Sequence, residues 1–193
     1  MNEMAGKPQR TPDDDEVRAD FVPAAAYISP EYVRLEKERL WPRVWQMACR
    51  EEEIPNPGDF SRSRLGTREV VAVRGVDGAV NVLVNRCAHR SMQVCSANRG
   101  NRAELVCPYH QWTYDLEGKL IGLPFRRGFR GQGGMPEDFR PEDHGLERLA
   151  VASRHGVVFA SFAKPNETLE EYLGPLMLSY FDRVFNGREL TVL

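Results

Sequence analysis

Short apolar runs separated by turn residues occupy the middle of the chain and predict antiparallel β-strands. Each run is four to eight residues long and rich in Val and aromatic residues, as is typical of strands. Turn residues stand between the runs at positions 56–58, 66 and 77–78. The pattern therefore predicts an antiparallel meander with strands over residues 44–48, 59–63, 69–73 and 80–84.

Further β-structure is expected in the second half of the chain. Residues 112–115 and 119–121 flank Leu116-Glu117-Gly118, which predicts a hairpin. Residues 156–162 form a last strongly apolar, β-branched run. Together with the meander, these elements predict an all-β core of antiparallel sheets.

Helical patterns flank this core on both sides. Ser29 and Pro30 provide an N-cap and a first-turn proline for an amphipathic helix over residues 31–40, which would end before Pro42. Near the C-terminus, residues 168–173 and 176–185 show helical spacing, with Gly174 and Pro175 between them. We therefore expect flanking N- and C-terminal helices.

Composition and charge exclude several classes of protein. The chain has 193 residues, 41% of them hydrophobic, and a net charge of −2, which is no nucleic-acid signature. Residues 1–20 hold three basic and six acidic side chains and predict a disordered acidic tail. No apolar leader or membrane-spanning run is visible, so we expect a cytoplasmic protein without a membrane partner.

Four residues in two short motifs carry the candidate chemistry. Cys87-Ala-His89 and Cys107-Pro-Tyr-His110 each follow an apolar run and offer one thiolate and one imidazole. Two sulfurs and two nitrogens suit either zinc or an iron–sulfur cluster. In a Rieske [2Fe–2S] centre two histidines replace two cysteines on one iron. The alternatives are a structural zinc site and four unconnected residues.

The surroundings of these motifs carry a family resemblance. Residues 85–90 read Asn-Arg-Cys-Ala-His-Arg, and residues 107–112 read Cys-Pro-Tyr-His-Gln-Trp. From about Tyr27 onward the chain resembles the N-terminal part of the alpha subunit of Rieske non-heme iron aromatic-ring-hydroxylating oxygenases. The resemblance implies the Rieske fold, with one iron bound by the two cysteines and the other by the two histidines. Arg90 and Trp112 would then cover the imidazole edge, the alternative being plain loop packing.

A finer resemblance concerns the aromatic-carboxylate subgroup of this family. Residues 125–135 carry three arginines and four glycines and predict a long surface loop, either a docking or subunit-contact loop or a solvated insertion. This loop, residues 136–139 and residues 171–175 look similar to anthranilate, salicylate and terephthalate oxygenases.

The remaining cysteines and histidines are assigned no metal role. Cys49 is expected to be a small buried hydrophobe, and Cys95 has no ligand spacing of its own. Four cysteines with two committed to metal argue against a disulfide framework. A mononuclear iron would need two histidines and a carboxylate clustered on a helix. His144 and His155 lie eleven residues apart in sequence without such a cluster, so loop and turn packing is the expected role of both.

The expected organisation follows from these assignments. Residues 1–20 form the tail, 21–43 an N-terminal helical segment, 44–165 the Rieske domain, and 166–193 a C-terminal helical segment leading to an absent catalytic domain. The mononuclear Fe(II) belongs in that domain, so no catalytic residue is assigned here.

Two functions of different class remain open. The first is an electron relay from a ferredoxin or reductase to the catalytic domain of the same or a neighbouring alpha subunit, with a small beta subunit as a further partner. The second is a stand-alone Rieske-type ferredoxin. A zinc-binding interaction module is a third and weaker hypothesis.

Overall fold

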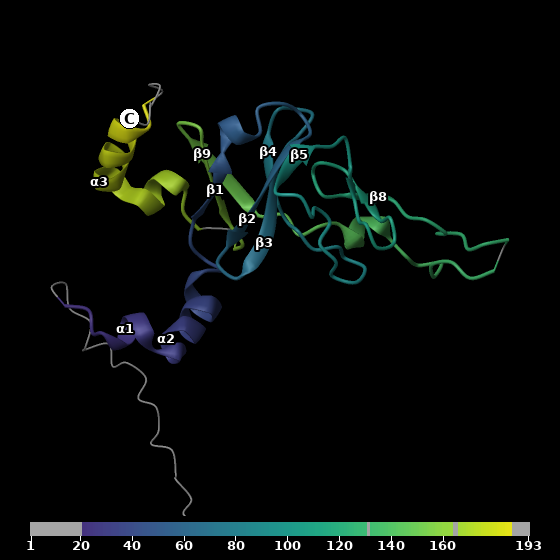
Figure 1. The fold of residues 1–193 in the computed structure, drawn as a ribbon, viewed down its shortest axis with the longest axis horizontal. Helices are drawn as coiled ribbons and strands as arrows, with labels where there is room; N and C mark the ends of the chain where they lie inside the picture. The colour runs from purple at the N-terminus through teal and green to yellow at the C-terminus, as the bar shows by residue number, and fades with distance from the viewer. Residues whose placement is uncertain (1–20, 131, 164–165, 187–193) are drawn as a thin grey trace, which may run out of the picture. The chain divides into compact units, whose positions relative to one another are not determined.

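The computed structural model describes residues 21–130, 132–163 and 166–186. The chain forms two compact units, residues 1–41 and 42–193 (Figure 1). The predicted acidic tail, residues 1–20, lies outside the described residues, as do residues 187–193 of the predicted C-terminal segment. None of the helices in the described ranges is long and apolar enough to cross a membrane.

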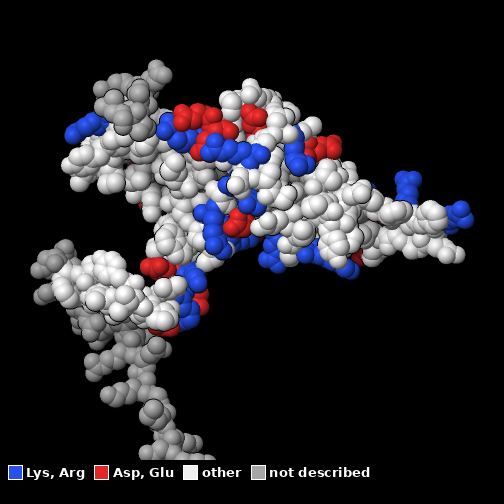
Figure 2. All heavy atoms as spheres, viewed as in Figure 1, with Lys and Arg blue, Asp and Glu red and all other residues white. Residues whose placement is uncertain are grey.

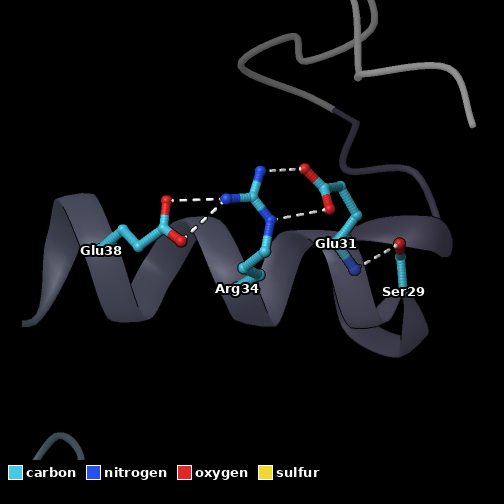
Figure 3. A network of polar contacts seen from close by, with 4 residues as sticks. All are labelled: Ser29, Glu31, Arg34 and Glu38. Carbon is cyan, nitrogen blue, oxygen red and sulfur yellow. Dashed lines mark hydrogen bonds and ion pairs between the residues drawn. The ribbon is translucent and has the colours of Figure 1, made fainter.

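The described part of the first unit, residues 21–41, is mainly helical, as its sequence predicts. It contains α1 (Ala25–Ile28), α2 (Pro30–Leu35) and a π-helix, η2 (Glu36–Leu40). The Ser29 hydroxyl accepts a hydrogen bond from the Glu31 N–H at 3.3 Å, which confirms the predicted N-cap. Arg34 lies between Glu31 and Glu38 along the exposed helix face and donates to both carboxylates (Figure 3). Such i,i+3 and i,i+4 pairs support the helix.

Three small antiparallel sheets form the second unit, which confirms the predicted fold class. The first sheet has the order β1-β10-β9, the second β4-β3-β2-β5, and the third β6-β7-β8. Their strands are β1 (Gln46–Arg50), β2 (Asp59–Leu65), β3 (Arg68–Arg74), β4 (Val80–Val84), β5 (Arg99–Asn101), β6 (Leu105–Val106), β7 (Thr113–Tyr114), β8 (Leu120–Gly122), β9 (Ala150–Arg154) and β10 (Val157–Ser161). The hairpin β7–β8 is confirmed at Leu116-Glu117-Gly118.

The meander prediction was wrong for its first strand. β2, β3 and β4 pair in sequence order, but β1 pairs with β10 in a different sheet. A 3-10 turn, η3 (Glu51–Glu53), and the irregular residues that follow redirect the chain between β1 and β2. β5 and β9 were not predicted because β5 is fully exposed and β9 has few β-branched residues.

Two hydrophobic cores occupy the second unit. One lies where β1 and β10 meet the second sheet and includes Ile54, Val70, Val82 and Val158. The other joins the second and third sheets and includes Phe60, Leu105 and Tyr114, together with Cys87 and Cys107. The two predicted ligand cysteines are therefore part of a packed core.

A kinked helix, α3 (Leu169–Val184), follows the last strand. Thr168 and Glu171 form a capping box at its start. Gly174 has a φ of 68°, a conformation that favours glycine, and breaks the helix where the sequence predicts two segments. Phe181 packs on Phe159 of β10, with ring centroids 5.9 Å apart, and fixes the second half of α3 to the first sheet.

Candidate metal centre

The two predicted ligand loops have the same backbone conformation. Cys87 follows β4, its N–H donates to the Met92 carbonyl at 2.8 Å, and the Ser91 N–H donates to the Cys87 carbonyl at 2.9 Å. Cys107 follows β6 and makes the two equivalent bonds, to the Trp112 carbonyl and from the Gln111 N–H, both at 2.9 Å. In each loop the backbone of the cysteine is thus hydrogen-bonded to the residues four and five positions further along the chain, and we call this pair of bonds the backbone clamp.

A left-handed residue closes each loop at the same position. Ser91 has a φ of 59° and Gln111 a φ of 56°. Non-glycine residues seldom adopt this conformation, and it persists where the surroundings hold it in place. The two loops differ in where the histidine stands, since His89 is two residues after its cysteine and His110 three.

The two cysteine sulfurs lie in the core beside a buried phenol. The Cys87 Sγ is 3.2 Å from the Tyr114 Oη, and the Ala88 N–H donates to the same oxygen at 3.1 Å. With the Ala88 N–H as donor, the phenolic hydrogen is free to point at the sulfur. Burial, and then the neighbouring Cys87 thiol, raise the pKa of Tyr114, so it stays protonated as a donor.

The Cys107 thiol is within reach of both Cys87 and loop amides. Burial raises the pKa of Cys107, and Cys87 raises it further, whereas the Tyr109 and His110 N–H groups lower it by bonding to the sulfur. Both cysteines are free thiols. Two buried thiols that affect each other's pKa, one of them 3.2 Å from a buried phenol, suit a shared metal centre.

The two imidazoles lie edge to face at the outer side of the thiols. The ring centroids of His89 and His110 are 4.6 Å apart, with an angle of 70° between the rings. Burial, and then the charges of His110 and Arg90, lower the pKa of His89 and favour a neutral ring. The His110 Nδ1 is buried without a hydrogen-bond partner among the described residues. A buried ring nitrogen with a free lone pair is a fitting metal ligand.

The two thiols and two imidazoles therefore fit a [2Fe–2S] centre with mixed cysteine and histidine ligands. Such a centre takes two ligands on each iron, so it needs two pairs and not a group of three. No three His, Cys, Asp or Glu side chains of the described ranges converge on a site for a single ion.

An aromatic ring lies against each of the two imidazoles. Trp112 stacks on His89 with centroids 4.9 Å apart and 7° between the rings. Phe139 and His144 lie behind Trp112, with centroids 6.1 and 6.0 Å from it. Tyr109 lies 3.8 Å from His110 by centroids and is 57% exposed. Trp112 therefore covers one face of the His89 ring.

The structure also locates Arg90 and the cysteines and histidines to which no metal role was assigned. Arg90 is exposed and is close enough to lower the pKa of His89, but it does not stack on it. Cys49 and Cys95 are buried, and burial raises their pKa to about 12 and about 11. His155 lies at a turn and contacts Asp182 at 3.1 Å.

Sequence reasoning missed two residues that support the site. Asn85 is buried two positions before Cys87, and its side chain bonds to the backbone of Val94 and Cys95 at 2.8 to 3.0 Å, closing the first loop. Tyr114 was expected only as a hairpin residue, because its contact with Cys87 depends on the pairing of β6 with β7. Asn85 belongs to the quoted segment 85–90, so its position two residues before Cys87 could have identified it.

A hollow of about 560 Å³ opens beside the imidazoles. It is lined by His89, Tyr109, His110, Gln111, Trp112, Pro124, Phe125 and Met135. The last three belong to the loop that follows β8, so this loop forms one wall of the hollow. The histidine edge is consequently open to a partner.

Comparison with known proteins agrees with this geometry. Residues 44–132 match the Rieske [2Fe-2S] domain family. The chain is 51% identical over 177 residues to the large oxygenase component of salicylate 5-hydroxylase from Ralstonia sp., covering 89% of this chain and 42% of that protein. It is 46% identical to the large subunit of anthranilate 1,2-dioxygenase from Burkholderia cepacia, covering 91% and 41%.

Solved structures give the same result. Naphthalene 1,2-dioxygenase from Rhodococcus sp. bound to indole superposes with a TM-score of 0.76 at 35% identity, over 84% of this chain and 36% of that one. The chain thus spans less than half the length of the relatives that it matches. Residues 44–132 form a Rieske domain similar to that of the alpha subunits of aromatic-ring-hydroxylating oxygenases.

Proposed function

We propose that the chain holds a Rieske [2Fe–2S] cluster and relays electrons within a ring-hydroxylating oxygenase. Cys87 and Cys107 would bind one iron through sulfur, and His89 and His110 the other through nitrogen. The twin loops carry this proposal, because the same backbone clamp recurs in both, each loop offers one buried thiol and one imidazole, and the two imidazoles lie 4.6 Å apart by ring centroids.

The ligand set suits an electron relay. When bound, the cluster accepts and releases one electron at a potential of about −150 to +300 mV, against about −400 mV for plant-type all-cysteine clusters. The Tyr114 hydroxyl and the Tyr109 and His110 amides would stabilise negative charge on the cysteine sulfurs. Trp112, 4% exposed, excludes water from the face of His89.

The direction of electron flow is part of the same proposal. A ferredoxin or reductase would supply electrons, and a mononuclear iron in a catalytic domain, of the same or a neighbouring alpha subunit, would receive them. A small beta subunit is a further partner. The similarity to salicylate, anthranilate and terephthalate oxygenases supports an aromatic carboxylate as the substrate of the complete enzyme.

The similarity outside the Rieske match favours this role over a stand-alone ferredoxin. The family match covers residues 44–132, whereas the salicylate 5-hydroxylase component aligns over 177 residues. The sequence similarity to an oxygenase component thus extends beyond the Rieske match into the flanking segments. We expect the purified chain to accept one electron per cluster and to form no product from an aromatic acid, NADH and donor proteins. Product formation by this chain alone would contradict the proposal that it only transfers electrons and that a catalytic domain carries out the hydroxylation.

Anaerobic reconstitution tests the cluster assignment. Protein loaded with iron and sulfide should be red-brown and contain two irons and two acid-labile sulfides per chain, the composition of a [2Fe–2S] cluster. A colourless protein that binds one zinc instead would overturn the proposal in favour of a zinc module.

A further inference from the structure

The two ligand loops are connected to their sheets in different ways. The second loop joins β6 to β7, and these two strands pair with each other, so it is the loop of a hairpin. The first loop lies between β4 and β5, which are at opposite edges of the second sheet. Strand pairing therefore closes the second loop, whereas the first loop depends on other contacts for its closure.

The segment that follows the first loop supplies these contacts. We call residues 92–98, which connect this loop to β5, the strap. The carbonyl of Met92, its first residue, accepts the Cys87 N–H at 2.8 Å, which is one of the two bonds of the backbone clamp. Val94 and Cys95 of the strap are buried in the core that also contains the ligand cysteines. The strap is therefore bonded directly to the backbone of one proposed ligand.

Asn85 holds the inner side of the strap. Its Oδ1 accepts the N–H groups of Val94 and Cys95 at 3.0 and 2.9 Å, and its Nδ2 donates to the Cys95 carbonyl at 2.8 Å. The Asn85 backbone N–H donates to the Glu69 carbonyl of β3 at 3.0 Å, which fixes Asn85 to the second sheet. Because buried N–H groups need a partner, loss of this side chain should release the strap.

Arg62 of β2 holds the outer side of the strap. Its guanidinium donates to the Ser96 carbonyl at 3.0 Å and to the Asn98 Oδ1 at 2.8 Å, and its backbone N–H donates to the Asn98 carbonyl at 2.8 Å. Several Lys and Arg side chains lie on the surface of the second unit (Figure 2). Arg64, two residues along the same strand, is such a surface residue, with a side chain that is 67% exposed and 3.7 Å from Glu69.

We propose that Asn85 and Arg62 are positioning residues that hold the first ligand loop in its binding geometry before a cluster binds. The inference rests on the proposed function and adds which residues preorganise one of the two loops. Every bond in this arrangement joins atoms of the chain itself, so the arrangement is available to the metal-free protein. Ligands that are already ordered bind more tightly, because binding then carries no cost of ordering them.

The alternative is that Asn85 and Arg62 stabilise only the fold as a whole. The destination of their bonds favours positioning. Within the described ranges, the side-chain hydrogen bonds of both residues all end on the strap. Since the strap in turn bonds to Cys87, loss of either side chain should loosen the first loop and leave the second loop unchanged.

Amide hydrogen exchange in the metal-free full chain tests this selectivity. In Asn85→Ala the N–H groups of Cys87 and Ser91, which form the first backbone clamp, should exchange about ten-fold faster, because local opening of the strap is no longer opposed. The N–H groups of Cys107 and Gln111, which form the second clamp, should exchange at wild-type rates. Equal acceleration in both loops, or none in the first, would overturn the inference.

Two matched pairs of variants make this test specific. Asn81→Ala is the control for Asn85→Ala, because Asn81 is also a buried asparagine and lies on β4, four residues earlier. Arg62→Gln should accelerate exchange in the first loop less than Asn85→Ala does, and it tests the same strap if Asn85→Ala does not fold. Arg64→Gln is its control on the same strand. A first loop that opens as much in the controls would contradict the assignment.

Release of iron from the loaded chain to a chelator measures the consequence for binding. Release should be about ten-fold or more faster in Asn85→Ala, the range usual for residues that support metal ligands, and several-fold faster in Arg62→Gln. The visible spectrum of the remaining cluster should stay that of the wild type. Wild-type release rates in both variants would overturn the positioning inference alone. Failure of the wild-type chain to assemble a cluster would overturn the proposed function, whatever the exchange rates are.

Discussion

The two ligand loops share a backbone and differ in what surrounds them. Each is clamped on its cysteine and closed by a left-handed residue, Ser91 or Gln111. The ring behind His89, Trp112, is 4% exposed, whereas the ring beside His110, Tyr109, is 57% exposed. The backbone clamp is thus the same in the two loops, whereas the ring packed on His89 is buried and the ring beside His110 is exposed.

Removal of any donor atom should have the largest effect. Cys87→Ser, Cys107→Ser, His89→Ala and His110→Ala should each lose the cluster completely, because each loop contributes one bond to each iron. Cys95→Ser is the matched control, since Cys95 is a buried cysteine close to the first loop and is not proposed as a ligand. Iron and sulfide analysis provides the readout. A full cluster in any of the four ligand variants would refute the assignment of that residue.

The two backing rings should differ strongly in their effect on stability. Trp112→Leu should lower the free energy of unfolding by about 2 to 3 kcal/mol, because it opens a cavity between His89 and Phe139. Tyr109→Leu should change it by less than about 0.5 kcal/mol, as is usual for exposed positions. Denaturant unfolding of the loaded protein measures both. Equal losses of unfolding free energy in the two variants would show that Trp112 and Tyr109 stabilise the fold to the same extent.

The closing residues, in contrast, should behave alike in the two loops. Ser91→Val and Gln111→Val should each destabilise by about 1 to 2 kcal/mol, because a β-branched residue is poorly tolerated at positive φ. Ser91→Gly and Gln111→Gly should be neutral or slightly stabilising, since glycine adopts this conformation without strain. Thermal release of the cluster is a suitable measurement. A loss confined to one loop would break the equivalence of the backbones.

The smallest predicted effect is a change in the reduction potential of the cluster when the Tyr114 hydroxyl is removed. Tyr114→Phe removes the hydroxyl 3.2 Å from the Cys87 sulfur. A hydrogen bond worth about 1 kcal/mol more in the reduced state corresponds to about 40 mV for a one-electron couple, so the potential should fall by roughly that amount. Redox titration measures it with the cluster intact. An unchanged or higher potential would mean that the phenol does not donate to this sulfur.

Much of the fold and the donor set could be predicted from local patterns. The strand over residues 80–84 and the Cys-x-His after it are both readable in sequence, as are the hairpin and the kinked C-terminal helix. The missed features depend on contacts between distant residues. Tyr114 reaches Cys87 only through the register of β7, and Phe139 and His144 reach Trp112 only because the chain folds back after the loop that follows β8. Nothing about serine or glutamine as residue types predicts positive φ at Ser91 and Gln111.

The central claim is that two imidazoles and two thiolates divide between two irons. Electron–nuclear double resonance of the dithionite-reduced protein tests it most directly, because it detects nitrogen bound to iron. We predict couplings from two inequivalent imidazole nitrogens, which would disappear with selective ¹⁵N-histidine labelling and be replaced by ¹⁵N couplings. A reduced iron–sulfur protein without histidine nitrogen couplings would contradict the account.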